Sequence, residues 1–177
     1  MAWEDDLFAL LDDLEQQAEA LYDAERAPEL ADRSRAAYQE VTLASRLMAS
    51  LEQDVTLEVR GVGVVAGTLS RTTAEWCLVR GPGQDWLVRL AAVAAVTGAS
   101  ERALPEVAWS PVSRLGLGSP LRRLAESGER CVVRTLDGHA QEGEVARVGR
   151  DFVEVVGPGG RAALVAFAAL AAVQSHD

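Results

Sequence analysis

Apolar and polar residues alternate along residues 55–60, where Val55, Leu57 and Val59 share one parity. An alternation of period two is typical of a strand with one buried face. Glycines and the Gly81-Pro82-Gly83 turn interrupt the similar runs that follow. The pattern predicts five short strands, at residues 55–60, 64–70, 75–80, 85–90 and 93–97.

The chain contains this pattern twice, because residues 131–173 repeat residues 55–96. A shift of 76 positions places Gly67 on Gly143 and the first Gly-Pro-Gly turn on a second one. After one inserted residue, the segment 90–96 falls on the segment 167–173. Because the glycines, the turn and the closing strand match in order, we interpret the two stretches as a duplicated β-unit.

A period of three to four residues marks the first third of the chain. Residues 3–25 carry one apolar stripe, which predicts an amphipathic helix that ends before Pro28. Proline suits the first position of a helix, so we expect a second helix over residues 28–51. The short link between them predicts an antiparallel helical hairpin. A further short helix is expected at 120–126, after the capping hydroxyl of Ser119.

Short strands with a glycine in the middle suit a small, strongly curved barrel. We therefore expect an α+β protein with an N-terminal α-helical hairpin and two small five-stranded antiparallel β-barrels, each preceded by a helix. The predicted boundaries are 1–53 for the acidic hairpin, 54–98 for the first barrel, 99–118 for a linker, and 119–177 for the short helix plus the second barrel.

The second copy contains VVRTLDG followed by GEVARVGRDFVEV. A helix followed by five bent strands with this pattern resembles the Sm-like family, which includes Hfq. The overall layout also resembles a group of acidic actinobacterial proteins. The positions that carry the family resemblance are Gly138, Gly143, Val145, Val148 and Phe152 in the second copy, and Gly67 and Leu69 in the first.

The resemblance implies a site for single-stranded RNA, which the family forms with an Asp and an Asn around the loop between its second and third strands. The matching positions here are Gly149 and Val153 in one copy, and Thr73 and Cys77 in the other. The family's second motif has a basic group, which is missing here from residues 90–92 and 167–169. RNA binding needs basic grooves and stacking platforms, so the RNA site does not transfer.

The negative charge is confined to the N-terminal segment. Residues 1–54 hold 14 acidic residues and 4 arginines, whereas the remaining residues hold 13 of each. Such a segment is typical of a solvated helix face or of a site for a basic protein partner. The longest apolar run, residues 162–173, is too short to span a bilayer, and the MAWEDD start lacks the pattern of a signal peptide. We expect a cytoplasmic protein with no membrane association.

No constellation of residues indicates catalysis, a metal site or a cofactor, so we do not expect an enzyme. His139 lies in a turn and His176 in the C-terminal tail, where a solvated imidazole is the simpler interpretation. Cys77 and Cys131 occupy different positions of the repeat and lack the spacing of a zinc site. Both are interpreted as buried structural thiols.

Two sets of side chains are candidates for contact with a partner. Trp76 and Phe152 occupy equivalent positions of the repeat, and each either seats a short helix or meets a partner. Arginines near strand ends and turns either form surface ion pairs or contact nucleic-acid phosphates. These arginines are Arg71, Arg80, Arg147, Arg150 and Arg161.

The function that these patterns favour is that of a non-enzymatic interaction and oligomerisation module, a scaffold or adaptor built from duplicated units. The N-terminal helices are expected to mediate self-association, as a homodimer or a higher oligomer, or to recruit a protein partner. The alternative is a divergent Hfq-like regulator that binds RNA through the arginines.

Overall fold

The computed structural model describes residues 35–175. The chain divides into two compact units, residues 1–41 and residues 42–177. The second unit contains both copies of the repeat. No helix among the described residues is both long enough and apolar enough to cross a bilayer.

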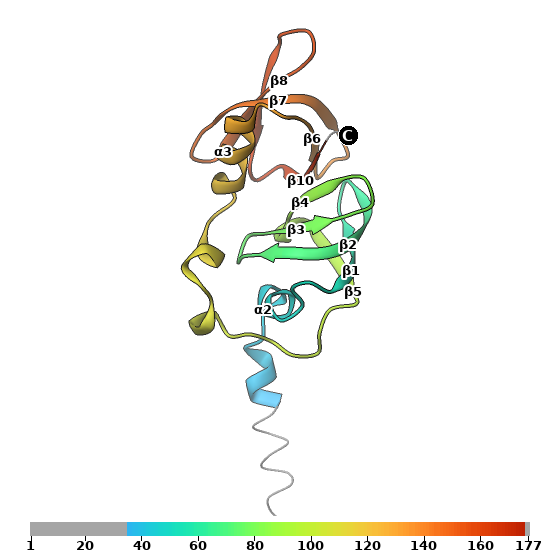
Figure 1. Ribbon diagram of the computed structural model, residues 1–177, viewed down its shortest axis with the longest axis vertical. Helices are drawn as coiled ribbons and strands as arrows, with labels where there is room; N and C mark the ends of the chain where they lie inside the picture. The colour runs from blue at the N-terminus through green and yellow to red at the C-terminus, as the bar shows by residue number, and fades with distance from the viewer. Residues whose placement is uncertain (1–34, 176–177) are drawn as a thin grey trace, which may run out of the picture. The chain divides into compact units, whose positions relative to one another are not determined.

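Ten strands form one antiparallel sheet in the order β5-β1-β2-β3-β4-β10-β6-β7-β8-β9 (Figure 1). The first copy contributes β1 (Asp54–Val59), β2 (Gly63–Thr72), β3 (Trp76–Arg80), β4 (Asp85–Arg89) and β5 (Val93–Thr97). The second copy contributes β6 (Arg130–Thr135), β7 (Ala140–Val148), β8 (Phe152–Val156), β9 (Ala162–Ala166) and β10 (Leu170–Ser175).

The expectation of two closed five-stranded barrels is wrong, because β4 and β10 join the two copies into a single open sheet. Within the described part of the chain, β5 pairs only with β1, and β9 pairs only with β8. The physical reason lies in β4, where Trp86, Leu87 and Val88 are all buried. A strand that is apolar on both faces is most stable between two neighbours, and β10 supplies the second one.

The two copies nevertheless fold alike, strand by strand. Val55 pairs with Gly67 in the first copy, and Cys131 pairs with Gly143 in the second. Both central hairpins have a register shift at the same point, between Leu69 and Arg71 and between Val145 and Arg147. The matched glycines of the sequence therefore mark matched positions in the sheet.

The predicted helical hairpin is also wrong in the part that the structure describes. Residues 35–39 are helical, but this helix ends at Gln39, and α2 (Leu43–Met48) begins separately. Thr42 is extended and caps α2, its hydroxyl accepting from the Ser45 amide while the Ser45 hydroxyl accepts from the Thr42 amide. This capping box starts a new helix where a continuous one was expected. The predicted helix at residues 3–25 lies outside the described residues.

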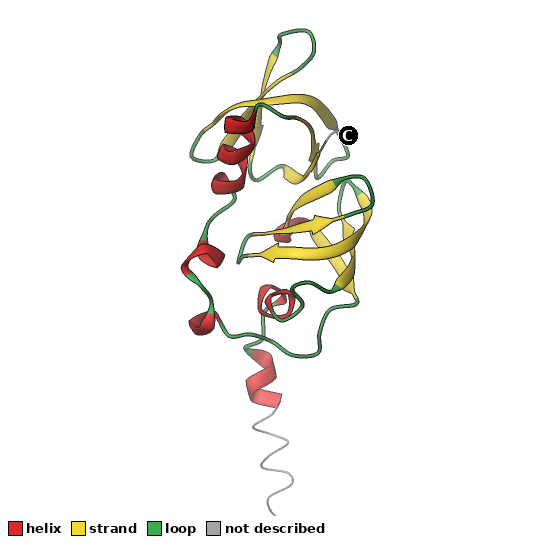
Figure 2. Ribbon diagram, viewed as in Figure 1, coloured by secondary structure: helices red, strands yellow, loops and turns green. Residues whose placement is uncertain are grey.

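A long connection with little regular structure leads from β5 to the second copy (Figure 2). It contains two single-turn helices, η2 (Glu106–Ala108) and η3 (Pro111–Arg114). It ends in α3 (Gly118–Ser127), which stops at Gly128 in the left-handed conformation with φ of 67°. Glycine adopts this conformation at helix ends because it has no Cβ. A third short turn, η1 (Leu90–Ala92), links β4 to β5.

Two hydrophobic clusters form the core, and each contains residues of both copies. The first cluster packs α2 residues such as Leu47 against the first copy, together with Ala171 and Ala172 of β10. The second packs Leu121 of α3 against the second copy, together with Trp76 and Leu87 of the first. Burying a side chain the size of leucine contributes roughly 1.5–3 kcal/mol. Because each core contains buried side chains of both copies, this burial holds the two copies together.

Candidate functional site

The seam between β4 and β10 is the place where one copy of the repeat recognises the other. Backbone pairing joins Val88 to Ala172, Leu87 to Val173 and Trp86 to Gln174. Because the strands are antiparallel, residue pairs with main-chain hydrogen bonds alternate with pairs without them, and these bonds do not depend on side-chain identity.

Side chains reinforce this seam at both ends. The Asp85 amide donates to the Ser175 hydroxyl over 2.8 Å, and an Arg89 guanidinium N–H donates to the Ala168 carbonyl over 3.0 Å. The side-chain amides of Gln174 and Gln84 are also hydrogen-bonded to each other. These contacts make the seam more specific than a bare strand pair.

A groove of about 460 Å³ lies at the seam, between α3 and the neighbouring strands. Leu78, Leu87 and Val173 contribute apolar lining, and Arg123 and Arg130 lie among the polar residues. Sequence reasoning missed this groove because it exists only where the two copies meet.

The two edge strands of the sheet, β5 and β9, are equivalent to the seam strands β10 and β4. Within the described residues, each has a partner strand on one side only. The β9 strand consists of the residues AALVA, with no charge and no proline to block a further strand. Leu164 in its centre is 68% exposed, whereas Leu87 at the equivalent point of β4 is 4% exposed. The β5 strand reads VAAVT and has only partly buried or exposed residues. Sequence reasoning did not single out these edges, although the apolar run at 162–173 was visible.

Trp76 and Phe152 have different surroundings despite their equivalent positions. Trp76 is 7% exposed, and its indole N–H donates to the Leu115 carbonyl over 2.9 Å. It packs in the cluster of Leu121, so it seats the α3 of the other copy rather than a helix of its own. Phe152 is partly exposed at the start of β8, with its ring against Gly149.

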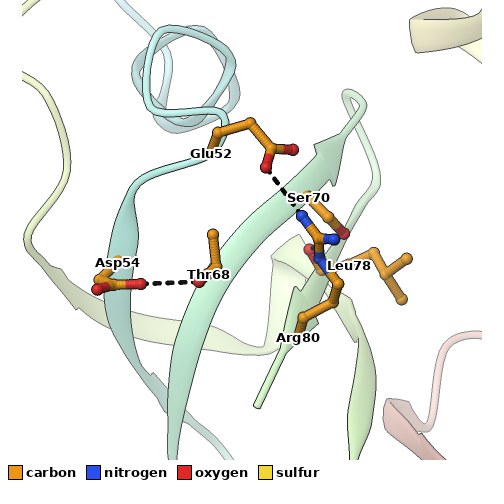
Figure 3. Close-up of polar contacts among 6 residues, drawn as sticks. All are labelled: Glu52, Asp54, Thr68, Ser70, Leu78 and Arg80. Carbon is orange, nitrogen blue, oxygen red and sulfur yellow. Dashed lines mark hydrogen bonds and ion pairs between the residues drawn. The ribbon is translucent and has the colours of Figure 1, made fainter.

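The candidate arginines divide into paired and unpaired groups. Arg80 forms an ion pair with Glu52 at 2.8 Å (Figure 3), and Arg147 forms one with Glu154 at 2.7 Å. Among residues 35–175, no ion pair is found for the other three, which the structure does not bring together. Of these, Arg71 lies in β2, Arg150 in the turn before β8, and Arg161 in the loop before β9.

The structure places both thiols in the interior and His139 in an exposed turn. Burial raises the pKa of Cys77 to about 12 and that of Cys131 to about 11, which keeps both thiols protonated at neutral pH. His139 lies 3.2 Å from Asp137 in an exposed turn. The Thr135 hydroxyl, which donates to Asp137, lowers the pKa of that carboxyl. Over the described range, no three metal-binding side chains are placed to hold an ion.

The features that bear most on function are the seam between β4 and β10 and the two edge strands, β5 and β9, which are the equivalents of β10 and β4 in the other copy. Both present backbone N–H and C=O groups flanked mainly by apolar side chains, which are the groups through which strands pair. Compared with known proteins, the sequence matches no family model and no curated protein.

Proposed function

We propose that this protein is a non-enzymatic interaction and oligomerisation module that binds strands of other chains at its free sheet edges. The observation that carries the proposal is the exposure of Leu164 in the centre of edge strand β9. Soluble proteins usually block an exposed edge with charge, proline or a covering segment. An uncharged apolar edge is the pattern of strands that add a partner.

The energetics of such an edge favour association. A strand that pairs with β9 gains main-chain hydrogen bonds along five residues and covers Leu164. Covering one leucine contributes up to roughly 1.5–3 kcal/mol, and the backbone bonds add specificity. The predicted helix at residues 3–25, which the sequence also leads us to expect in association, lies outside the described residues.

Light scattering coupled to size exclusion, for wild type and the Leu164→Lys variant over a range of concentrations, tests the proposal. We expect an oligomer for the wild type and a shift towards single chains for the variant, because a buried lysine opposes strand addition. Val64→Lys is the matched control, since Val64 is 69% exposed but lies in β2, where it already pairs with Glu58 of β1 and is not part of an edge strand. A wild type that is a single chain at every concentration would contradict the proposal.

The alternative, a nucleic-acid-binding regulator, has weaker support. Salt bridges to Glu52 and Glu154 occupy Arg80 and Arg147, which reduces their availability to phosphates. The three arginines without ion pairs belong to different parts of the sheet, whereas a nucleic-acid groove needs clustered positive charge.

A further inference from the structure

We infer that the groove between α3 and the seam strands binds a small monocarboxylate with an apolar chain, of the class of the medium-chain fatty acids, and that Arg71 holds its carboxylate. The groove has a volume of about 460 Å³ and is lined by residues of both copies. Small-molecule sites are concave, mostly apolar and roughly 300–1,000 Å³ in volume, with a few polar groups that fix orientation. This ligand site is separate from the edge strands, so it goes beyond the proposed function.

The floor of the groove is a row of four opposed side chains. Arg71 of β2 is opposite Leu78 of β3, which is opposite Leu87 of β4. Across the seam, Leu87 is opposite Val173 of β10. Directly opposed residues of antiparallel strands project from the same face of the sheet, and all four line the groove. The row therefore extends over three strand spacings, about 14 Å, with a guanidinium at one end of an apolar track.

Helix α3 supplies further apolar lining. Its Leu124 is partly buried and packs, like Leu78, against the second hydrophobic cluster. Trp76 also lines the groove, two residues before Leu78 on the same face of β3. Leu87 and Val173 are buried, whereas Leu78 stays partly exposed. An apolar chain in the groove would remove this remaining surface from water, which is favourable.

The arginines around the groove leave one cation available to an anion. Arg123 forms an ion pair with Glu126 at 3.3 Å, and Arg130 forms one with Glu142 at 3.0 Å. Over residues 35–175, the side chain of Arg71 has no ion pair or hydrogen bond. A guanidinium binds a carboxylate through paired, charge-assisted hydrogen bonds. Arg71 is therefore the group that fits the charged end of the ligand.

Two acidic residues of the lining limit the charge of the ligand. Asp85 begins β4 and Glu129 directly precedes β6, which are two and four strands away from β2 in the sheet. Their carboxylates repel a second negative charge beyond the Arg71 end of the groove. The groove should therefore prefer a monocarboxylate to a dicarboxylate of the same length, and to a polyanion.

Equilibrium dialysis of the full chain with labelled octanoate measures the binding. We expect saturable binding, and competitors that displace the label establish its chemistry. Hexanoate should bind roughly tenfold more weakly, because two fewer CH₂ groups are buried. 1-Octanol lacks the carboxylate and suberate has a second one, so each should also bind roughly tenfold more weakly than octanoate.

Substitutions assign the binding to the groove. Arg71→Gln should weaken octanoate binding roughly tenfold and remove the preference for octanoate over 1-octanol. Arg102→Gln is the matched control, because Arg102 is exposed and forms no ion pair in the described part of the chain, but lies in the connection after β5 and not in the groove. Leu78→Gln should weaken octanoate and 1-octanol alike, since it places a polar group in the apolar track. Circular dichroism establishes that each variant is folded.

The remaining outcomes overturn the inference. An absence of saturable octanoate binding would refute the site. Equal affinity for octanoate and 1-octanol, or equal weakening by Arg71→Gln and Arg102→Gln, would refute the role of Arg71. Competitive displacement of octanoate by a short uridine oligonucleotide that binds more tightly would assign the groove to nucleic acid instead. Light scattering reports on the proposed function separately, because a single chain that binds octanoate would refute that function and keep this inference.

Discussion

At the scale of single residues, Gly67 and Gly143 show why the repeat keeps a glycine at one point of each copy. A Cβ at Gly67 would lie 2.2 Å from the Arg80 carbonyl oxygen, and one at Gly143 would lie 2.3 Å from that of Val156. Both oxygens belong to the neighbouring strand of the same hairpin, so only glycine lets the two backbones approach this closely. The sequence match at these positions thus has a steric cause.

Gly143→Ala should therefore destabilise the protein. The added methyl must push β8 away from β7, at a cost of about 1–3 kcal/mol for overpacking. Urea unfolding followed by circular dichroism measures the change. Gly159→Ala is the control, because a Cβ there meets no atom within 4 Å, and its effect should stay within about 0.5 kcal/mol. If the two variants were equally stable, the close approach of the β7 and β8 backbones would not be the reason for glycine at position 143.

The two buried thiols should make the free energy of unfolding fall as the pH rises through the alkaline range. Their pKa values are raised from 9.0 to about 12 for Cys77 and to about 11 for Cys131. Above pH 9 the unfolded chain releases these protons, whereas the folded chain keeps them until its own pKa values are reached. The free energy of unfolding should therefore fall between pH 9 and 11, by up to about 1.4 kcal/mol per pH unit and thiol.

Denaturant titrations between pH 8 and 11 measure this slope. The control is a chain with Cys77→Ala and Cys131→Ala, which lacks both thiols but keeps every tyrosine. Its slope should be shallower than that of the wild type by the contribution of the thiols. Parallel curves for the two proteins would contradict the raised pKa values.

At the scale of elements, local patterns were sufficient to find the strands but not their neighbours. The alternation at 55–60 and the turns around the glycines identify β1 to β4 because a strand's two faces leave a period of two in the sequence. No comparable sequence pattern shows which strand pairs with the second side of β4. The strands β5 and β10 are equivalent in the two copies and have similar sequences, so either could pair with β4. Only the polar contacts of Arg89 and Ser175 in the structure distinguish β10 as the partner.

The break before α2 was visible in the sequence in a different way. Thr42 and Ser45 have the spacing of a helix cap, but the apolar stripe through this region masked that signal. The candidate site was missed for the same reason as the pairing. Leu164 belongs to an apolar run, and an edge strand differs from a central one only in what lies beside it.

At the scale of the compact unit formed by residues 42–177, the two copies of the repeat form one sheet and share both hydrophobic cores. The first core includes Ala171 and Ala172 of β10, and the second includes Trp76 and Leu87 of the first copy. Neither core is complete unless the other copy is folded. This interdependence predicts that the two copies unfold together.

Cys77 and Cys131 report on the two cores separately, because each thiol lies in a different cluster. We expect both to become reactive towards a thiol reagent at the same urea concentration. Leu87→Ala should shift both midpoints downward together, since it removes a side chain that the first copy places in the second core, at a cost of about 2–5 kcal/mol. Val107→Cys, at a side chain that is 86% exposed, gives the reactivity of an unprotected thiol. Reaction of Cys131 at a lower urea concentration than Cys77 would show that the second copy opens alone, and that the seam joins two domains that fold independently.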